Sequence, residues 1–79
     1  MENKKPSIKY RAGTVTATVW KNENKEGKTF FSVDIVRNYT TEENDTVKWH
    51  KSSSFNTKDL ADVMIVTRKV QEYIRLKEE

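Results

Sequence analysis

Aromatic and basic side chains recur along the stretches of this chain that are typical of β-strands. Aromatic rings can stack on unpaired bases and cations can pair with phosphates, so the combination predicts a surface that binds single-stranded nucleic acid. Each stacked base contributes roughly 1–3 kcal/mol to such binding. The candidate binding residues are Lys9, Tyr10, Arg11, Trp20, Lys28, Phe30, Arg37, Lys48, His50 and Lys51.

Two features of the same stretches allow a simpler interpretation. Threonine-rich faces are ordinary on the solvent side of antiparallel sheets, and Trp20 and Phe30 flank a polar turn across which they could pair with each other. Trp49 can be assigned either to the core or to the binding surface, because a slip of one residue exchanges the two faces of a strand. The alternative to nucleic-acid binding is a protein–protein interaction or adaptor module.

Residues suited to catalysis or metal binding are scarce. The chain has one histidine, His50, and no cysteine. A zinc site needs more ligands than these, and acid–base or nucleophilic catalysis needs several titratable groups that converge. The acidic cluster of Glu42, Glu43 and Asp45 lacks the spacing and the glycine of an EF-hand loop. We therefore expect no enzyme activity, no metal and no cofactor.

The composition limits the setting of the protein. The chain has 79 residues and a formal net charge of +3, a mildly basic balance that favours an acidic partner such as nucleic acid. The amino-terminal residues lack the apolar run of a signal peptide, and no stretch approaches the roughly 18 apolar residues of a membrane span. We expect a cytoplasmic protein with no membrane partner.

Alternating apolar and polar residues predict a small antiparallel sheet. Residues 1–8 are expected to form a flexible amino-terminal segment, and residues 9–77 a single domain of the ββββα type. Strands are expected over about 9–21, 28–39 and 46–53, and the first is long enough to bend at Gly13 and count as two. The fold class is therefore α+β, an antiparallel three- or four-stranded meander followed by one long carboxy-terminal helix.

The helix has the clearest start signal in the chain. Asn56 suits the N-cap, and Asp59 can accept a hydrogen bond from it as in a capping box, which predicts a helix over residues 57–77. Its apolar stripe is wider than one small sheet needs, so we expect a homodimer with Ile65, Val66 and Tyr73 in the interface. The alternative is that Ile65 and Val66 cover the sheet edge.

The order of elements resembles that of the positive-cofactor-four-like single-stranded-DNA-binding transcriptional coactivators and the wider Whirly-type group. The matching stretches are residues 31–39, 48–54 and 56–60, that is, a strand ending in Arg37-Asn38-Tyr39, a basic strand and a capped helix. Residues 11–20 are also similar to the amino-terminal strand of small uncharacterised microbial and phage proteins. The resemblance implies dimerisation through the helix and a concave sheet that grips single-stranded DNA or RNA with low sequence specificity, in transcription or DNA maintenance. Arg37 and Lys51 would match the family's basic positions, and Trp20 or Phe30 a stacking position.

Overall fold

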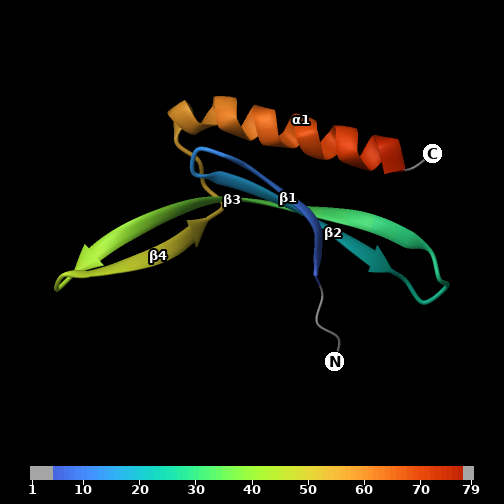
Figure 1. Ribbon diagram of the computed structural model, residues 1–79, viewed down its shortest axis with the longest axis horizontal. Helices are drawn as coiled ribbons and strands as arrows, with labels where there is room; N and C mark the ends of the chain where they lie inside the picture. The colour runs from blue at the N-terminus through green and yellow to red at the C-terminus, as the bar shows by residue number, and fades with distance from the viewer. Residues whose placement is uncertain (1–4, 78–79) are drawn as a thin grey trace.

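The computed structural model of the protein describes residues 5–77. It contains a four-stranded antiparallel sheet in the order β1-β2-β3-β4, followed by one helix (Figure 1). This architecture confirms the predicted α+β meander with a carboxy-terminal helix. The elements are β1 (Pro6–Ala12), β2 (Val15–Glu23), β3 (Thr29–Glu43), β4 (Thr46–Ser52), a single 3₁₀ turn η1 (Thr57–Asp59) and α1 (Leu60–Lys77).

The first predicted strand is two strands joined by a tight reversal at Gly13 and Thr14. Gly13 has a φ of +60°, a conformation that glycine adopts without the steric cost of a Cβ atom. β1 begins at Pro6, ahead of the predicted start at Lys9, and Ile8 packs against the core. Residues 6–8 therefore belong to the sheet rather than to a flexible segment, whereas residues 1–4 of that prediction lie outside the described residues.

β3 is longer than predicted and serves two partners in succession. Its first part, from Thr29 to Arg37, pairs with β2, and its second part, from Arg37 to Glu43, pairs with β4. Residues 40–45, which separate two of the predicted strands, are mostly strand, because the reversal needs only Asn44 and Asp45, which have φ values of 51° and 63°. Positive φ at both central residues is typical of the tight hairpin turns that match strand twist.

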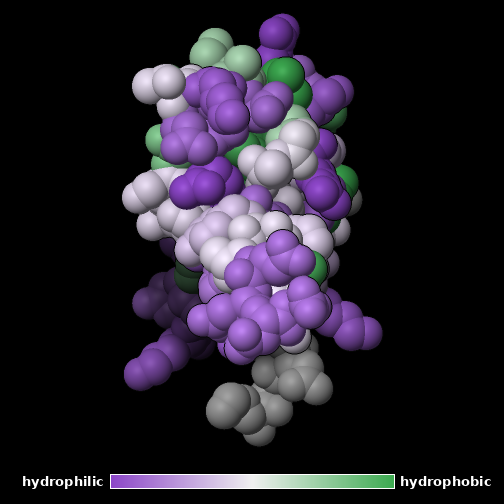
Figure 2. Space-filling model, turned by 90° about the vertical axis from the view of Figure 1, so that its left-hand side faces the viewer, coloured by the Kyte–Doolittle hydropathy of each residue, from purple (hydrophilic) through white to green (hydrophobic). Residues whose placement is uncertain are grey.

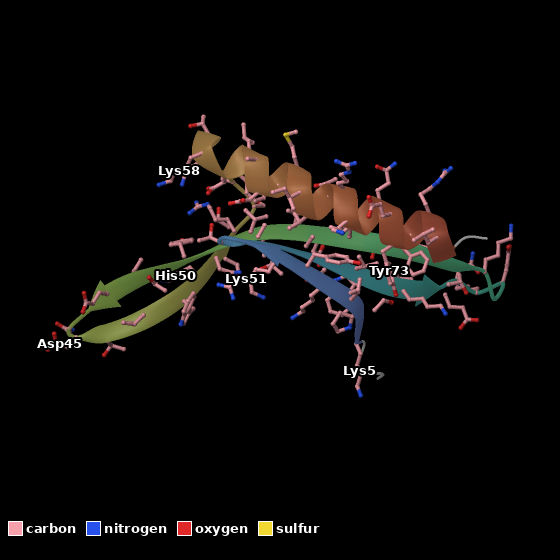
Figure 3. The ribbon with its side chains drawn as sticks, turned by 45° about the horizontal axis from the view of Figure 1, so that its top comes forward. Lys5, Asp45, His50, Lys51, Lys58 and Tyr73 are labelled. Atoms are coloured by element: carbon pink, nitrogen blue, oxygen red, sulfur yellow. The ribbon has the colours of Figure 1, made fainter. Side chains whose placement is uncertain are left out.

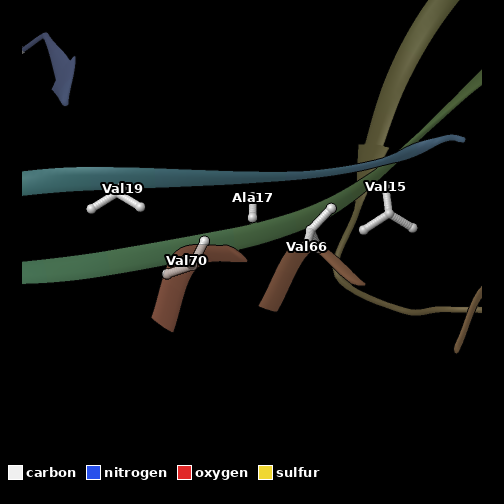
Figure 4. Close-up of a cluster of buried hydrophobic side chains, with 5 residues drawn as sticks. All are labelled: Val15, Ala17, Val19, Val66 and Val70. Carbon is white, nitrogen blue, oxygen red and sulfur yellow. The ribbon is translucent and has the colours of Figure 1, made fainter. Parts of the chain in front are cut away.

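The core lies between α1 and one face of the sheet, which we call the helix face. Its fully buried side chains are small and come from β2 and α1 only: Val15, Ala17, Val19, Val66 and Val70 (Figure 4). Larger residues such as Phe31, Ile35 and Tyr73 pack around this cluster and remain partly exposed. Both ends of the sheet bend away from α1, so the opposite face, which we call the outer face, lies on the concave side of an arch (Figure 1).

Candidate nucleic-acid interface

Strand register decides which candidate side chains share a surface. Residues directly opposed in an antiparallel pair lie on the same face, and faces alternate along each strand. Ala17 is buried under α1 and pairs with Ile35, so the odd-numbered residues of β2 and of the first part of β3 lie on the helix face. The even-numbered residues of these segments, among them Trp20 and Phe30, lie on the outer face.

The outer face brings together half of the predicted binding residues. These are Lys9 and Arg11 from β1, Trp20 from β2, Phe30 from β3 and Lys51 from β4. Trp49, which the sequence left between two faces, pairs with Thr40 and so lies on the outer face as well, with 71% of its surface exposed. Figure 3 shows Lys51 on the concave side of the arch.

Four predicted binding residues lie on the helix face instead. Tyr10 pairs with Ala17 and packs against the core, while His50 pairs with Tyr39 and Lys48 with Thr41. The alternation within β4 was predicted correctly, but the face of Lys48 and His50 was not. The pairing of β4 with β3 assigns both residues to the face opposite Trp20. Arg37 is the fourth residue, and Lys28 lies in the turn before β3.

The Arg37 side chain makes its contacts within the protein. Its Nε atom donates a hydrogen bond to the Ser54 carbonyl oxygen at 2.9 Å and lies 3.9 Å from an Asp59 carboxylate oxygen. The guanidinium group also lies 5.1 Å from the centre of the Tyr39 ring. The same Asp59 carboxylate accepts the backbone N–H of Asn56 at 3.1 Å, as the predicted capping box requires. Arg37 thus ties the helix start to the point where β2, β3 and β4 meet.

Exposed candidate residues lie at both ends of the outer face. At the β2–β3 end, the indole N–H of Trp20 donates to Asp34 at 3.0 Å, and the amide of Asn22 donates to Ser32 at 3.0 Å. Phe30 is half exposed at the same end. At the β3–β4 end, Trp49 and Lys51 are both exposed. Figure 2, which looks onto this end, shows a surface that is mostly hydrophilic.

A long stretch of β3 separates the two tryptophans. Trp20 pairs with Ser32 and Trp49 pairs with Thr40, so the two register positions are eight residues apart along β3. At about 3.3 Å per residue this stretch is roughly 26 Å long. The face could therefore contact several nucleotides of an extended strand at once.

The residues predicted for a helix dimer interface do not form one surface. Val66 is only 1% exposed and belongs to the core, so it cannot meet a partner, and its prediction as an interface residue is wrong. Tyr73 points between α1 and the sheet, where its ring lies edge-on to Phe31 at 6.3 Å (Figure 3). Ile65 is exposed, as are Leu60, Met64 and Leu76, so the helix does carry surplus apolar surface.

An apolar groove beside the helix was not predicted from the sequence. It lies between α1 and the first part of β3, has a volume of about 420 Å³, and is lined by Val33, Ile35, Thr67, Val70, Gln71, Ile74 and Arg75. One helix is too narrow to cover a sheet of several strands, and this could have predicted a groove. α1 packs mainly on β1 and β2, so the helix face of β3 is left partly uncovered.

Residues 5–77 were searched for clusters of metal ligands and for helices that could span a membrane. No three His, Asp or Glu side chains of this part of the chain gather closely enough to hold a metal ion. Its one long helix is too polar to cross a bilayer. No protein-family model, curated protein or solved structure matches the chain, so the interpretation of the outer face depends on its own geometry.

Proposed function

We propose that the protein binds single-stranded DNA or RNA on the outer face, with little sequence preference, and acts in transcription or DNA maintenance in the cytoplasm. The observation that carries the proposal is the gathering of Trp20, Phe30 and Trp49 with Lys9, Arg11 and Lys51 on one concave face. Aromatic rings accept any base as a stacking partner, which gives affinity without sequence readout.

The charges of this face favour moderate rather than tight binding. Three cations, Lys9, Arg11 and Lys51, share the face with the carboxylates of Asp34 and Glu42. The Asp34 carboxylate accepts the Trp20 indole N–H, so it fixes the ring while it also repels phosphates nearby. We expect affinity to fall with salt, but with the shallow slope that a few phosphate contacts produce.

Titration of tryptophan fluorescence with a poly-thymidine oligonucleotide at two salt concentrations tests the proposal. Saturable quenching that weakens with salt is the expected result, because both tryptophans lie on the outer face. No change in fluorescence at low salt and micromolar protein would contradict nucleic-acid binding by this face.

β4 offers a matched pair of variants for the same titration. Lys51 lies on the outer face and Lys48 on the helix face, both are exposed, and removal of either changes the net charge equally. Lys51→Ala should weaken binding and lower the salt slope by about one, whereas Lys48→Ala should leave both nearly unchanged. Equal effects of the two variants would mean that net charge alone, and not this face, attracts the oligonucleotide.

The second candidate function is a protein-interaction or adaptor module. The exposed helix residues Leu60, Met64, Ile65 and Leu76 favour it, because exposed apolar surface on a small domain is typical of protein contacts. Such association would resist salt and would be weakened by Ile65→Glu, with no effect of Lys51→Ala.

A further inference from the structure

The first part of β3 has one edge that no strand covers. Residues 29–37 pair with β2 on one side, and β4 reaches the other side only from Arg37 onward, where Ser52 is its last paired residue. The chain then leaves the sheet through residues 53–56 and enters the helix start. Among the described residues, no strand continues the row of β4 along residues 29–36.

The backbone geometry shows which residues present hydrogen-bonding groups at this edge. The N–H of Asn38 donates to the Thr14 carbonyl on the β2 side at 2.8 Å. The backbone N–H and C=O groups of successive residues point to alternate edges of a strand. Those of the even-numbered residues of β3 therefore point toward β2, and those of the odd-numbered residues point to the opposite edge. Phe31, Val33 and Ile35 therefore direct their N–H and C=O groups out of the sheet, at the edge that lacks a strand.

This edge lacks the features that usually prevent pairing. Residues 29–36 contain no proline and no lysine, and their single charged residue is Asp34. The Asp34 side chain lies on the outer face, where it accepts the Trp20 indole N–H. On the helix face the edge runs beside the apolar groove, and Val33, which lines that groove, is 38% exposed.

We propose that a second copy of this chain pairs with this edge, β3 against β3 in antiparallel orientation, with the two-fold axis at Val33. In this register Val33 lies opposite Val33 of the second copy, Phe31 opposite Ile35, Phe30 opposite Val36 and Ser32 opposite Asp34. Aromatic and β-branched residues are favourable cross-strand partners, and a hydroxyl can donate to a carboxylate. The edge is thus complementary to itself, and no like charges oppose each other.

The neighbouring elements select this register. A symmetric antiparallel pair can be centred on an odd-numbered residue, which then hydrogen-bonds to its own copy, or on an even-numbered residue, which does not. Centring on Asp34 would set two like charges opposite each other, and centring on Ser32 would set the Phe30 ring opposite the Asp34 carboxylate. Centring on Ile35 would bring Val33 opposite Arg37 of the second copy, a position that Ser52 already occupies. Centring on Phe31 would set Ile35 opposite Gly27 of the second copy, which lies in the β2–β3 turn, so Ile35 and Val36 would have no strand partner. Centring on Val33 uses residues 30–36 in full.

The pairing would join two sheets into one of eight strands. The two helices would lie on the same side of it, and the two outer faces would form one continuous surface on the other. This dimer does not depend on nucleic-acid binding. Its interface is the β3 edge with the neighbouring groove, and not the exposed side of α1.

The mass of the full chain in solution, measured by light scattering on a sizing column, tests this dimer with two variants of one residue. Val33→Lys and Val33→Glu each set like charges against each other across the axis, so each should raise the dimer dissociation constant by roughly 100-fold or more. An equal mixture of the two should regain dimer, because residue 33 then meets its opposite charge. Circular dichroism should show that both variants keep their fold.

Variants elsewhere on the surface provide the controls. Val47→Lys adds the same charge on the exposed β3–β4 hairpin, and Ile65→Lys adds it on the far flank of α1, so both should leave the dimer intact. A monomer at all concentrations of the unmodified chain would overturn the proposal. A dimer that only Ile65→Lys disrupts, or one that persists unchanged in folded Val33→Lys, would overturn it as well.

Discussion

The two halves of the sheet are stabilised in different ways. The helix-backed half, formed by β1, β2, the first part of β3 and α1, contains every buried apolar residue among the described side chains. The β3–β4 hairpin, residues 38–52, has no fully buried side chain at all. Its cross-strand contacts are instead polar and aromatic: the Tyr39 ring stacks on His50 at 5.0 Å, and the Thr41 hydroxyl lies 2.8 Å from the His50 Nε2 atom.

This difference separates stability from surface chemistry. Burial of apolar area is the dominant stabilising term in folding, so the valine core should carry most of the stability of the domain. An isolated two-stranded hairpin is at best marginally stable, and the β3–β4 hairpin depends on the long β3 strand that it shares with the core. Side chains on that hairpin can therefore serve binding with little effect on folding.

Truncation of matched valines in the two halves should give the largest difference. Val19 is fully buried and Val47 is 58% exposed. Val19→Ala should lower the free energy of unfolding by about 2–3 kcal/mol, from lost transfer energy and the cavity left behind. Val47→Ala should change it by less than about 0.5 kcal/mol. Denaturant unfolding followed by circular dichroism measures both, and equal losses would contradict the division into a core half and a surface half.

The two outer-face tryptophans should separate binding from stability. Trp49→Ala should weaken oligonucleotide binding by roughly 1–3 kcal/mol, the contribution of one stacked base, and leave unfolding nearly unchanged. Trp20→Ala should lower both the oligonucleotide affinity and the free energy of unfolding, because it also removes the hydrogen bond to Asp34. Fluorescence anisotropy of a labelled oligonucleotide gives the affinity. The comparison would fail if Trp49→Ala destabilised the fold as much as Trp20→Ala.

Arg37 stands at the junction of the two halves and should affect mainly stability. Arg37→Ala removes a hydrogen bond to Ser54 and leaves the Asp59 carboxylate, which is largely buried, without its cation. We expect the free energy of unfolding to fall by about 1–2 kcal/mol, since the Asp59 carboxylate then lacks a neighbouring cation and the Ser54 carbonyl lacks its donor. Oligonucleotide affinity of the folded variant should change little. If Arg37→Ala lowered oligonucleotide affinity more than Lys51→Ala does, and left the free energy of unfolding unchanged, Arg37 would instead be a binding residue.

Local patterns in the sequence predicted the elements well. Val15, Ala17 and Val19 alternate with threonines, a pattern typical of a strand with one apolar face, and the three are buried in the structure. Asn56 with Asp59 predicted the helix start. The length of β3 could not be predicted, because Thr40–Glu43 are polar and pair as strand only once β4 supplies partners. Val66 was misassigned since an apolar helix stripe does not reveal which side meets the sheet.

The candidate site was predictable within a strand but not between strands. Trp20 and Phe30 could be assigned to one face because period-2 alternation relates them to the buried residues beside them. His50 and Lys48 could not, because their face depends on the register of β4 against β3. That register follows from the two-residue turn at Asn44 and Asp45, a detail hidden within a longer polar segment.

Loss of the Tyr39–His50 stack should have the smallest effect on the free energy of unfolding. It tests directly which interactions stabilise the β3–β4 hairpin. A double-mutant cycle of Tyr39→Ala and His50→Ala should show a coupling of about 0.5–1 kcal/mol, typical of a cross-strand ring pair. Thr41→Val, which removes the hydroxyl facing His50, isolates the polar part of that contact. A coupling near zero would mean that the hairpin is held by its backbone hydrogen bonds and by the continuity of β3 alone. A coupling as large as the loss in Val19→Ala would mean that the hairpin has a core of its own, and its surface could then no longer be altered without cost to the fold.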